Sequence, residues 1–392
     1  MATEANPSEL LVDGVPVARV AEPGTVEELQ AIVLAASHAN ERLLLAGGGT
    51  RLAFGNAGGP FDLAVSMRRL NRIIAYEPDD LTVAVEPGVT LAQLDGELAA
   101  HGQHLVLDSA HRAESTIGGA FATGLSGPRR LRYGALKENA LGIEVLTSDG
   151  TPTKAGGMVV KNVTGFDMMR LHYGALGAFG FITRLNFKVV PRPEAALYCR
   201  AEFGSAAQAH AAAVAMLGSG VELAALYVTA NAADSWTLHA VVDGGAEAAE
   251  RQARHIGELA GDAIVEPLAA SAAPGFETFL DLAADRTVAR IAMPASRQLE
   301  LLERMQFSGS EQLCADLGSG LVYIATLPKV EWRVALRRLD ARAVFLSLPP
   351  EQKLNLDVLA AEPGPALDVL RRLKHEFDPS GRFNHGRFVA GL

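Results

Sequence analysis

Residues 45–52 read LAGGGTRL and directly follow Leu43 and Leu44, so that an apolar run, which predicts a short buried strand, leads into three glycines. Adjacent glycines let backbone N–H groups converge on an anion, because no Cβ atom blocks the approach. The loop therefore predicts a cradle for a diphosphate group. It matches neither common nucleotide loop: Leu52 stands where a dinucleotide fingerprint has its third small residue, and no Gly-Lys-Ser/Thr follows.

Further glycine-rich segments strengthen this prediction, since the first loop alone is equally compatible with a plain glycine turn. They stand at residues 115–119 (STIGG), 124–127 (GLSG), 132–134 (RYG), 161–167 (KNVTGFD) and 174–183 (GALGAFGFIT). One loop can hold a phosphate, whereas several closely approaching backbones indicate a long cofactor threaded between them.

The first half of the chain mixes short strands with helices. Strands are predicted at residues 43–45, 62–66, 72–76 and 81–86, the last two joined by the turn sequence Glu-Pro-Asp-Asp. Thr90 and Gln93 form a capping box that opens a helix over residues 91–100, and Gly102 ends it.

The composition changes at residues 191–193 (PRP), where regular structure is hard to continue. Residues 1–190 contain 24 of the 39 glycines. Strands are predicted beyond the prolines at residues 197–203, 223–229, 237–242, 288–293, 322–327 and 343–348, and helices at 206–217, 247–259, 297–305 and 366–376. We therefore predict two domains, residues 1–193 and 194–392, the second of them α+β.

Charge and cysteine content exclude several classes of function. With 35 basic against 45 acidic residues the formal charge is −10, which is unsuited to a generally basic nucleic-acid binder. The two cysteines, Cys199 and Cys314, form no CxxC motif, so we predict no metal site or iron–sulfur cluster held by this chain alone. No signal peptide and no apolar run of about 18 residues is found, which indicates a soluble cytoplasmic protein without a membrane span.

Taken together, the glycine loops resemble the FAD-binding domain of the vanillyl-alcohol oxidase/para-cresol methylhydroxylase (PCMH) superfamily. The resemblance covers residues 10–193 and continues in the tail at residues 377–387 (FDPSGRFNHGR). Within the superfamily, residues 126–130 (SGPRR) and 160–167 (VKNVTGFD) are similar to the FAD-binding E subunits of bacterial glycolate oxidases. The fold implied is α+β: a two-part PCMH-type FAD-binding domain, then an α+β cap domain of the FAD-linked oxidase type whose tail returns to the flavin.

The resemblance also implies a set of FAD-binding residues. The first loop would bind the pyrophosphate through Gly47, Gly48, Gly49, Thr50 and Arg51, and the second loop would line the ribityl and pyrophosphate region with Ser115, Thr116, Gly118 and Gly119. The turn near the flavin would contribute Gly124 and Gly127. Ile182 would contact the adenine, and Asn384 and Arg387 of the tail would lie towards the isoalloxazine. Covalently flavinylated relatives carry a histidine in the first loop, which this chain lacks. Non-covalent FAD is therefore expected.

No catalytic residue can be assigned from the sequence. Related hydroxy-acid dehydrogenases carry a histidine-rich metal motif in the cap, but the corresponding residues 317–323 read LGSGLVY. Oxidation of a 2-hydroxy acid needs a base for the hydroxyl proton and a cation for the carboxylate. His375 and His385 are the only candidates for a base near the flavin, and the pairs Arg337-Arg338 and Arg371-Arg372 are expected on solvated faces of helices.

Three arginines, Arg129, Arg130 and Arg132, leave several roles open. They could attract the FAD phosphates, a substrate carboxylate or the acidic face of a partner, or they could lie on a solvated turn. His101, His104 and His111 fit no metal motif and are expected to be surface or hydrogen-bonding residues.

The resemblance implies a FAD-binding subunit of a glycolate oxidase/dehydrogenase complex, which oxidises the small 2-hydroxy acid glycolate to glyoxylate. The partners implied are a paralogous FAD-linked catalytic subunit with the hydroxy-acid site and a cysteine-rich iron–sulfur subunit. Such a complex would be cytoplasmic, or peripheral at the inner face of the cell membrane. Two alternatives stay open: a free-standing FAD-dependent oxidoreductase acting on another alcohol or hydroxy acid, and a structural subunit without redox activity.

Overall fold

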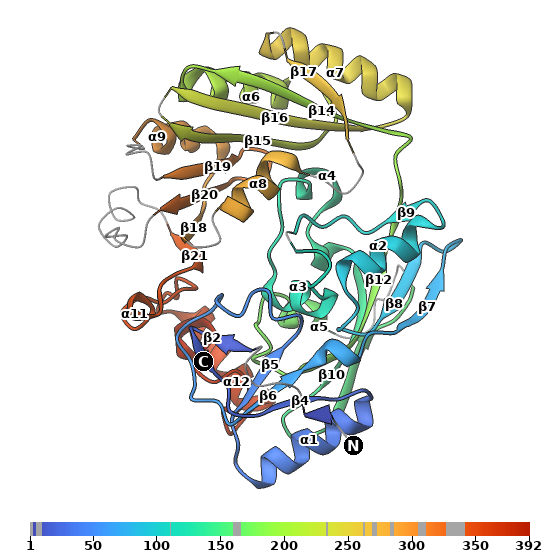
Figure 1. Cartoon of the computed structure of the whole chain (residues 1–392), viewed down its shortest axis with the longest axis vertical. Coiled ribbons are helices and arrows are strands. Elements are labelled where there is room, and N and C mark those ends of the chain that lie inside the picture. The colour runs from blue at the N-terminus through green and yellow to red at the C-terminus, as the bar shows by residue number, and fades with distance from the viewer. Residues whose placement is uncertain are drawn as a thin grey trace.

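The computed structural model describes residues 3–4, 10–109, 111–159, 166–232, 234–261, 263–268, 273–282, 286–304, 311–326 and 342–392. Most of the segment at residues 160–167 that carries part of the resemblance therefore lies outside the described residues. The eight-stranded sheet occupies the upper part of the molecule in Figure 1, and the smaller sheets lie below it together with both ends of the chain.

A four-stranded sheet carries the first glycine loop. Its strands, in spatial order, are β1 (Thr3–Glu4), β4 (Val20–Glu22), β6 (Leu63–Ser66) and β5 (Leu43–Ala46). Strands β5 and β6 run parallel, with Leu43 opposite Leu63. Helix α1 (Val26–His38) leads from β4 to β5 and buries Leu29 and Val33. Next to this sheet lies the hairpin of β2 (Leu11–Val12) and β3 (Val15–Pro16), and η2 (Met67–Arg69) follows β6.

A five-stranded antiparallel sheet completes the lower part of the molecule. Its spatial order is β11 (Pro152–Gly156), β10 (Ala140–Leu146), β12 (Phe181–Lys188), β8 (Thr82–Val85) and β7 (Ile73–Glu77). The predicted pairing of β7 with β8 is confirmed. The shorter elements around it are α2 (Leu91–Ala99), α3 (Ile117–Thr123), α4 (Arg130–Tyr133), η3 (Leu136–Glu138), α5 (Met168–His172) and the pair β9 (Gln103–His104) and β13 (Val190–Pro191). Leucines of α2 and Ile117 and Phe121 of α3 pack into one core with β8, β10 and β12.

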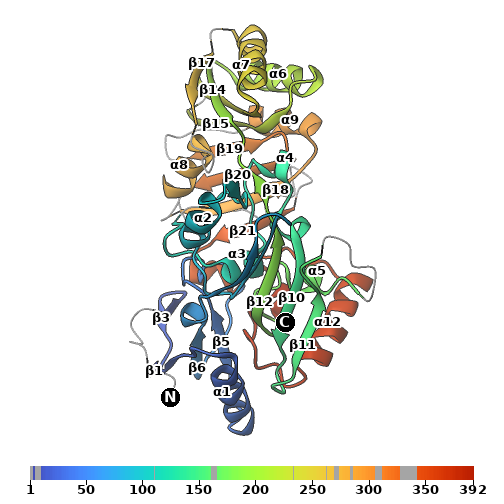
Figure 2. The ribbon, with the colours of Figure 1, turned by 90° about the vertical axis from the view of Figure 1, so that its right-hand side faces the viewer.

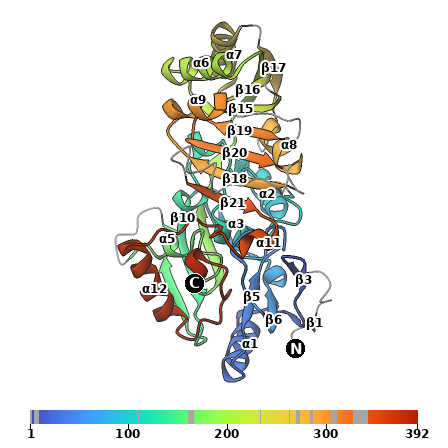
Figure 3. The same ribbon diagram turned by 90° about the vertical axis from the view of Figure 1, so that its left-hand side faces the viewer.

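The upper part is an eight-stranded antiparallel sheet, which we call the cap sheet. Its spatial order is β17 (Ile264–Pro267), β14 (Ala195–Phe203), β16 (Ser235–Gly244), β15 (Leu223–Ala232), β19 (Gln312–Asp316), β20 (Leu321–Thr326), β18 (Thr287–Ala292) and β21 (Ala343–Ser347). Figure 3 shows the strands from β16 to β21 stacked in this order. The six strands predicted beyond residue 193 are confirmed within the described residues.

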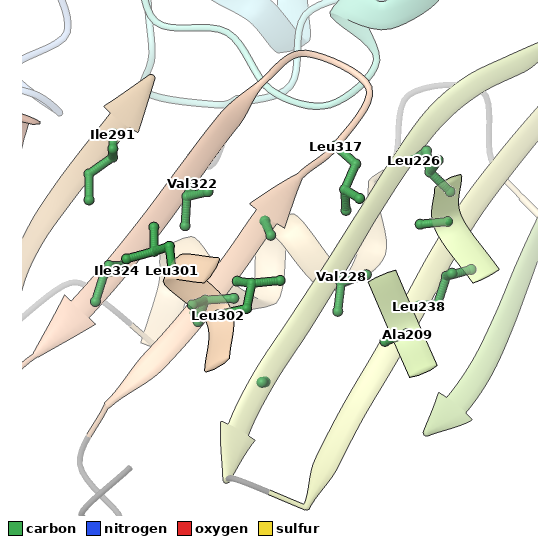
Figure 4. Close-up of a cluster of buried hydrophobic side chains, with 14 of the residues drawn as sticks. Ala209, Leu226, Val228, Leu238, Ile291, Leu301, Leu302, Leu317, Val322 and Ile324 are labelled. Atoms are coloured by element: carbon green, nitrogen blue, oxygen red, sulfur yellow. The ribbon is translucent and has the colours of Figure 1, made fainter. Parts of the chain in front are cut away.

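Helices α6 (Ala206–Gly218), α7 (Ala246–Ala260) and α9 (Ala295–Arg304) cover one face of the cap sheet. Leucines 301 and 302 of α9 and Ala209 of α6 pack on Val228, Leu238 and Ile324 of the strands (Figure 4). Helix α8 (Pro274–Leu282) lies on the other face, where Phe276 and Phe279 contact Tyr323 edge-on. Tyr133 of α4 packs against the core on that face.

After the cap sheet, the chain returns to the lower part through α11 (Pro350–Lys353) and α12 (Pro365–Phe377), and it ends in η4 (Val389–Gly391). Helix α12 lies beside β10 and β11 in Figure 2. The tail then pairs with β5: Leu43 N–H donates to the Arg382 carbonyl at 2.9 Å, and Asn384 N–H donates to the Leu43 carbonyl at 3.0 Å. Among the described helices, none is both long enough and apolar enough to span a membrane.

Candidate functional site: a cavity between the glycine loops

The first two glycine loops face each other at the end of β5. A Cβ atom on Gly47 would collide with the Thr116 hydroxyl, and one on Gly48 would collide with the Glu114 carbonyl. The Thr50 and Ser115 hydroxyls lie 3.1 Å apart. Glycine is therefore required in the first loop because the second loop occupies the space of its side chains.

Backbone amides of the first loop are left available by this arrangement. Among the described residues, the amides of Gly48, Gly49, Thr50 and Arg51 donate no backbone hydrogen bond. The carbonyl of Gly48 instead accepts from Arg68 Nη2 at 2.6 Å, which turns it away from the amides of its neighbours. Four successive amides without an acceptor can converge on one group, so this run is suited to an anion such as a diphosphate.

The two loops line a cavity with about 900 Å³ of empty space, counting its open mouth. Twelve of the fourteen expected FAD-binding residues line it, and these are Gly47, Gly48, Gly49, Thr50, Arg51, Ser115, Thr116, Gly118, Gly119, Ile182, Asn384 and Arg387. The structure thus brings together residues from the beginning, middle and end of the chain.

Gly124 and Gly127 do not line this cavity. Gly124 ends α3 with φ of +64°, and a Cβ atom there would meet Gly174. A Cβ atom on Gly127 would collide with the side chain of Asp108. Both glycines therefore serve close packing of the chain beside the cavity, whereas the preceding residues Ala122 and Thr123 line it directly.

The tail closes the cavity from the other side. Asn384 accepts from Leu45 N–H at 2.8 Å and donates to the Leu176 carbonyl, so both ends of its amide are occupied by the backbone. Arg387 is 3% exposed, and its Nη2 donates to the carbonyls of Leu52 and Phe54, each at 2.6 Å. Its Nη1 is buried without a partner. Arg387 thus stabilises the first loop through its Nη2, while its Nη1 can donate a hydrogen bond to a bound group.

Apolar side chains form much of the remaining wall, which the sequence did not single out. They are Leu45, Phe54, Met67, Pro87, Leu176 and Phe181. Such residues cannot be told from ordinary core by pattern alone, since both are apolar and buried.

This donor set fits FAD. Free loop amides and the unpaired Nη1 of Arg387 suit the charged middle of the cofactor, and the apolar wall suits its flat ring systems. When bound, FAD supplies a two-electron acceptor for substrate oxidation. None of the described residues that line the cavity is a histidine.

Comparisons with known proteins point to the same cofactor. A family model described as the FAD binding domain matches residues 17–166. The glycolate oxidase subunit GlcE of Escherichia coli (strain K12) is 38% identical over 33% of this chain and 37% of its own. The glycolate oxidase subunit GlcD of Bacillus subtilis (strain 168) is 30% identical over 45% of this chain and 37% of its own. These matches thus span little more than a third of either relative.

Two longer matches extend into the cap. An uncharacterised FAD-linked oxidoreductase of Mycobacterium tuberculosis (strain CDC 1551 / Oshkosh) is 26% identical across 94% of this chain and 90% of its own. The structure of alkyldihydroxyacetonephosphate synthase superimposes with a TM-score of 0.70 at 17% identity, over 94% of this chain and 76% of that one. The latter likeness shows a shared fold.

Fold and cavity together define a flavoprotein with a PCMH-type FAD-binding domain and an α+β cap. Residues 17–166 match the FAD binding domain, and FAD is the cofactor of this chain.

The three arginines left open by the sequence separate into distinct roles. Arg129 is buried and its Nε donates to Asp108 at 2.5 Å, which makes it a structural residue. Arg132 Nε lies 3.2 Å from Asp243 of the cap sheet. Arg130 is half-buried, with its Nη1 3.5 Å from the Ser126 hydroxyl and no carboxylate partner among the described residues.

Neither histidine of the tail lines the cavity. His375 is exposed on α12, and His385 Nδ1 lies 3.0 Å from the Gly381 carbonyl. Of the three histidines His101, His104 and His111, His104 is 5% exposed. Burial, together with the positive charges of Arg129 and Arg192, lowers the pKa of His104 to about 4. The described residues contain no cluster of metal-ligating side chains.

Proposed function

We propose that this chain is the FAD-binding subunit of a glycolate oxidase-type complex, in which glycolate is oxidised to glyoxylate. The hydroxy-acid site would lie on a paralogous FAD-linked subunit, and a cysteine-rich iron–sulfur subunit would carry electrons onwards. FAD is held here without a covalent bond by the first-loop amides and the tail. The complex would be cytoplasmic or peripheral at the inner face of the membrane.

One observation carries this proposal: the cavity offers free loop amides and an apolar wall to FAD, yet none of the described residues that line it is a histidine, aspartate or glutamate that could act as a base. The described segment that corresponds to the metal motif of related dehydrogenases is the tight turn between β19 and β20, with Gly318 packed on Leu131. A subunit whose flavin site has no base of its own would leave the oxidation of the hydroxy acid to the partner subunit. The 38% identity to GlcE over the matched third supports the glycolate assignment.

A free-standing FAD-dependent oxidoreductase is the second candidate. The observation that favours it is the match to the Mycobacterium tuberculosis protein, which extends over 90% of that protein's length and is described as a FAD-linked oxidoreductase rather than as a subunit. Such an enzyme would oxidise its own alcohol or hydroxy acid.

The test is to purify the chain alone, record its visible spectrum and add glycolate or D-lactate without oxygen. We expect bound flavin that stays oxidised, and reduction by glycolate only after the two partner subunits are added. Bleaching by the chain alone would favour the free-standing enzyme. A colourless protein that also leaves the complex fully active would indicate a structural subunit and overturn the proposal.

A further inference from the structure

A second cavity lies in the cap, on the face of the cap sheet that carries α8. It contains about 990 Å³ of empty space, counting its open mouth, compared with about 900 Å³ for the FAD cavity. Strands β14, β15, β16 and β19 and helix α8 supply its lining, and none of the described residues that line it also lines the FAD cavity. The proposed function makes no use of this cavity.

The cavity lies towards the strand ends that point away from the FAD-binding part. Thr237 lines it near the beginning of β16, whereas Tyr133 of the FAD-binding part bonds to Asp243 near the end of that strand. Gln312 lines it from the first position of β19. The cavity is therefore a separate site of the cap and not an extension of the FAD cavity.

The imidazole of His239 is the most deeply buried polar side chain of the described lining, at 4% exposed. Its Nδ1 lies 2.5 Å from the Tyr198 hydroxyl, and its Nε2 lies 2.7 Å from the Thr229 hydroxyl. Tyr227 stacks on the ring with the centroids 4.7 Å apart, and a Cβ atom on Gly275 of α8 would collide with it. These contacts fix the ring, so little conformational freedom is left to lose when a ligand binds.

The hydrogen bonds of His239 leave one hydroxyl proton unused. Burial, together with the positive charge of Arg200, lowers the pKa of His239 to about 3, so the neutral ring carries one proton. If Nε2 carries it, Tyr198 donates to Nδ1 and the Thr229 proton is unused; if Nδ1 carries it, Thr229 donates to Nε2 and the Tyr198 proton is unused. Neither hydroxyl has another partner among the described residues. Both tautomers therefore offer one O–H donor to a ligand.

The lining also contains an acceptor without a partner. Gln312 Oε1 is buried and accepts no hydrogen bond from the part of the chain that the structure describes. An unsatisfied buried carbonyl oxygen is costly, and a hydroxyl group of a ligand would satisfy it. Pro274, Phe279 and Leu313 provide an apolar surface beside these polar groups, which suits the C–H groups of a ligand.

The cavity offers a ligand little net charge. Arg200 is the only charged residue of the described lining, and its Nε lies 4.0 Å from the carboxylate of Glu202 on the same strand. Glu202 also accepts from the Thr237 hydroxyl at 2.8 Å. A matching ligand is therefore uncharged and carries hydroxyl groups, because a hydroxyl both donates and accepts and so fits either tautomer of His239.

We propose that this cavity binds an uncharged polyhydroxy compound, a sugar or polyol, through the hydroxyls of Tyr198 and Thr229 and the side-chain amide of Gln312. Ligand hydroxyls pair with the unused O–H donor and the free carbonyl oxygen, and the carbon skeleton lies against Phe279. The inference goes beyond the proposed function, which needs only the FAD cavity. Binding is measured on this chain alone, so the result does not depend on whether a complex oxidises glycolate.

The experiment adds glycerol, D-ribose, D-glucose and myo-inositol, one at a time, to the purified full chain loaded with FAD. Saturation-transfer NMR of each compound detects binding and measures affinity. The ring-nitrogen signals of isotope-labelled histidines report contact with His239, whose signals are assigned by their shift in Tyr198→Phe. We expect at least one compound to bind and to shift the His239 signals while the visible flavin spectrum stays unchanged.

Two variants test the polar groups. Gln312→Leu removes the free acceptor, and the double variant Tyr198→Phe, Thr229→Val removes both hydroxyls, since either one can supply the donor. Each should weaken binding roughly threefold to tenfold, the loss of one hydrogen bond between uncharged groups. The matched control is Tyr76→Phe, Thr153→Val, which removes two hydrogen-bonded hydroxyls within the FAD-binding part and should leave the affinity unchanged.

Several results would overturn the inference. One is that no compound binds, and another is that a compound changes the flavin spectrum but leaves the His239 signals in place. Affinity unchanged in both Gln312→Leu and the cap double variant, or lowered equally in the control, would do the same. Gluconate is added as the anionic counterpart of D-glucose, and tighter binding of gluconate would show that the cavity selects a carboxylate instead of an uncharged compound.

Discussion

At the scale of single residues, Asp316 is the most unusual acid in the chain. It is fully buried at the end of β19, its Oδ1 accepts from Ser319 N–H at 3.0 Å, and its Oδ2 has no partner. Burial raises its pKa to about 7, so the folded protein holds this proton more tightly than the unfolded chain does. The contribution of Asp316 to stability should therefore be greatest below about pH 4 and fall as the pH rises towards 7.

Asp316→Asn tests this directly. The amide keeps an acceptor for Ser319 N–H but cannot ionise, so the variant should lose the fall in unfolding free energy between pH 4 and 7. The effect at neutral pH is at most on the order of 4 kcal/mol, from a pKa raised by about three units. Urea unfolding across this pH range measures it, with the exposed Asp234→Asn as control. Parallel pH profiles of Asp316→Asn and the native chain would contradict the assignment.

Gly48 decides whether the cofactor cradle can form. Gly48→Ala places a methyl group against the Glu114 carbonyl, so one of the two loops must shift. Such overpacking costs about 1–3 kcal/mol, which corresponds to roughly fivefold to 150-fold weaker FAD binding. Gly96→Ala is the matched control, because Gly96 is exposed on α2 with nothing near its missing Cβ. Equal flavin content in the two purified variants would argue against the cradle.

At the scale of elements, α12 anchors the tail through a buried lysine. Lys374 Nζ donates to Asp378 at 2.7 Å, and to the carbonyls of Ala178 and Phe383 at 2.8 and 2.9 Å. The same Asp378 carboxylate accepts from Arg382 and Phe383 N–H groups. One ion pair therefore fixes the helix end, the tail and the Ala178 turn together.

Lys374→Met should destabilise the protein by about 3–5 kcal/mol, because it leaves a buried carboxylate without its cation. FAD content should fall with it, since the same tail carries Arg387. Arg371→Met on the same helix breaks only an exposed pair with Asp368 and should cost less than about 1 kcal/mol. Thermal unfolding and flavin absorbance measure both, and similar losses in the two variants would show that the buried pair does not anchor the tail.

The elements that the sequence predicts are those with a clear local signal. Thr90 is the N-cap of α2 as predicted, with its hydroxyl accepting from Gln93 N–H, and Ser205 caps α6 in the same way by accepting from Gln208 N–H. Strand β19 (Gln312–Asp316) was not predicted. Its five residues stand directly before residues 317–323, which had been compared with the metal motif of related dehydrogenases. Helix α1 was also missed, although the Thr25 hydroxyl accepts from Glu28 N–H and so provides the same capping signal.

At the scale of the whole molecule, the cap docks on the FAD-binding part through polar contacts as well as apolar ones. Tyr133 of α4 donates its hydroxyl to Asp243 of β16 at 2.6 Å, next to the ion pair of Asp243 with Arg132. Tyr133→Phe leaves a buried carboxylate oxygen without a donor and should cost about 1–3 kcal/mol.

Hydrogen exchange in β16 should therefore become faster in Tyr133→Phe. Tyr76→Phe is the control, because its hydroxyl bonds to Gln103 entirely within the FAD-binding part. It should leave β16 protection unchanged. Unchanged protection of β16 in Tyr133→Phe would mean that other contacts hold the cap in place.

The arrangement of the whole could not be predicted from sequence. The glycines of the first loop indicated the cradle because a backbone that must approach an anion closely requires glycine at adjacent positions of the sequence. The order of the cap strands, in contrast, depends on which distant segments pair, such as β15 with β19 across more than eighty residues.

The contact between β5 and the tail has a consequence for biosynthesis. The amide of Leu45 beside the first glycine loop is bonded to Asn384, 339 residues later in the chain. During translation the glycine loops leave the ribosome long before the wall that closes their cavity. FAD can therefore be captured tightly only after nearly the whole chain has been made, and a chain truncated before Asn384 should emerge as colourless apoprotein.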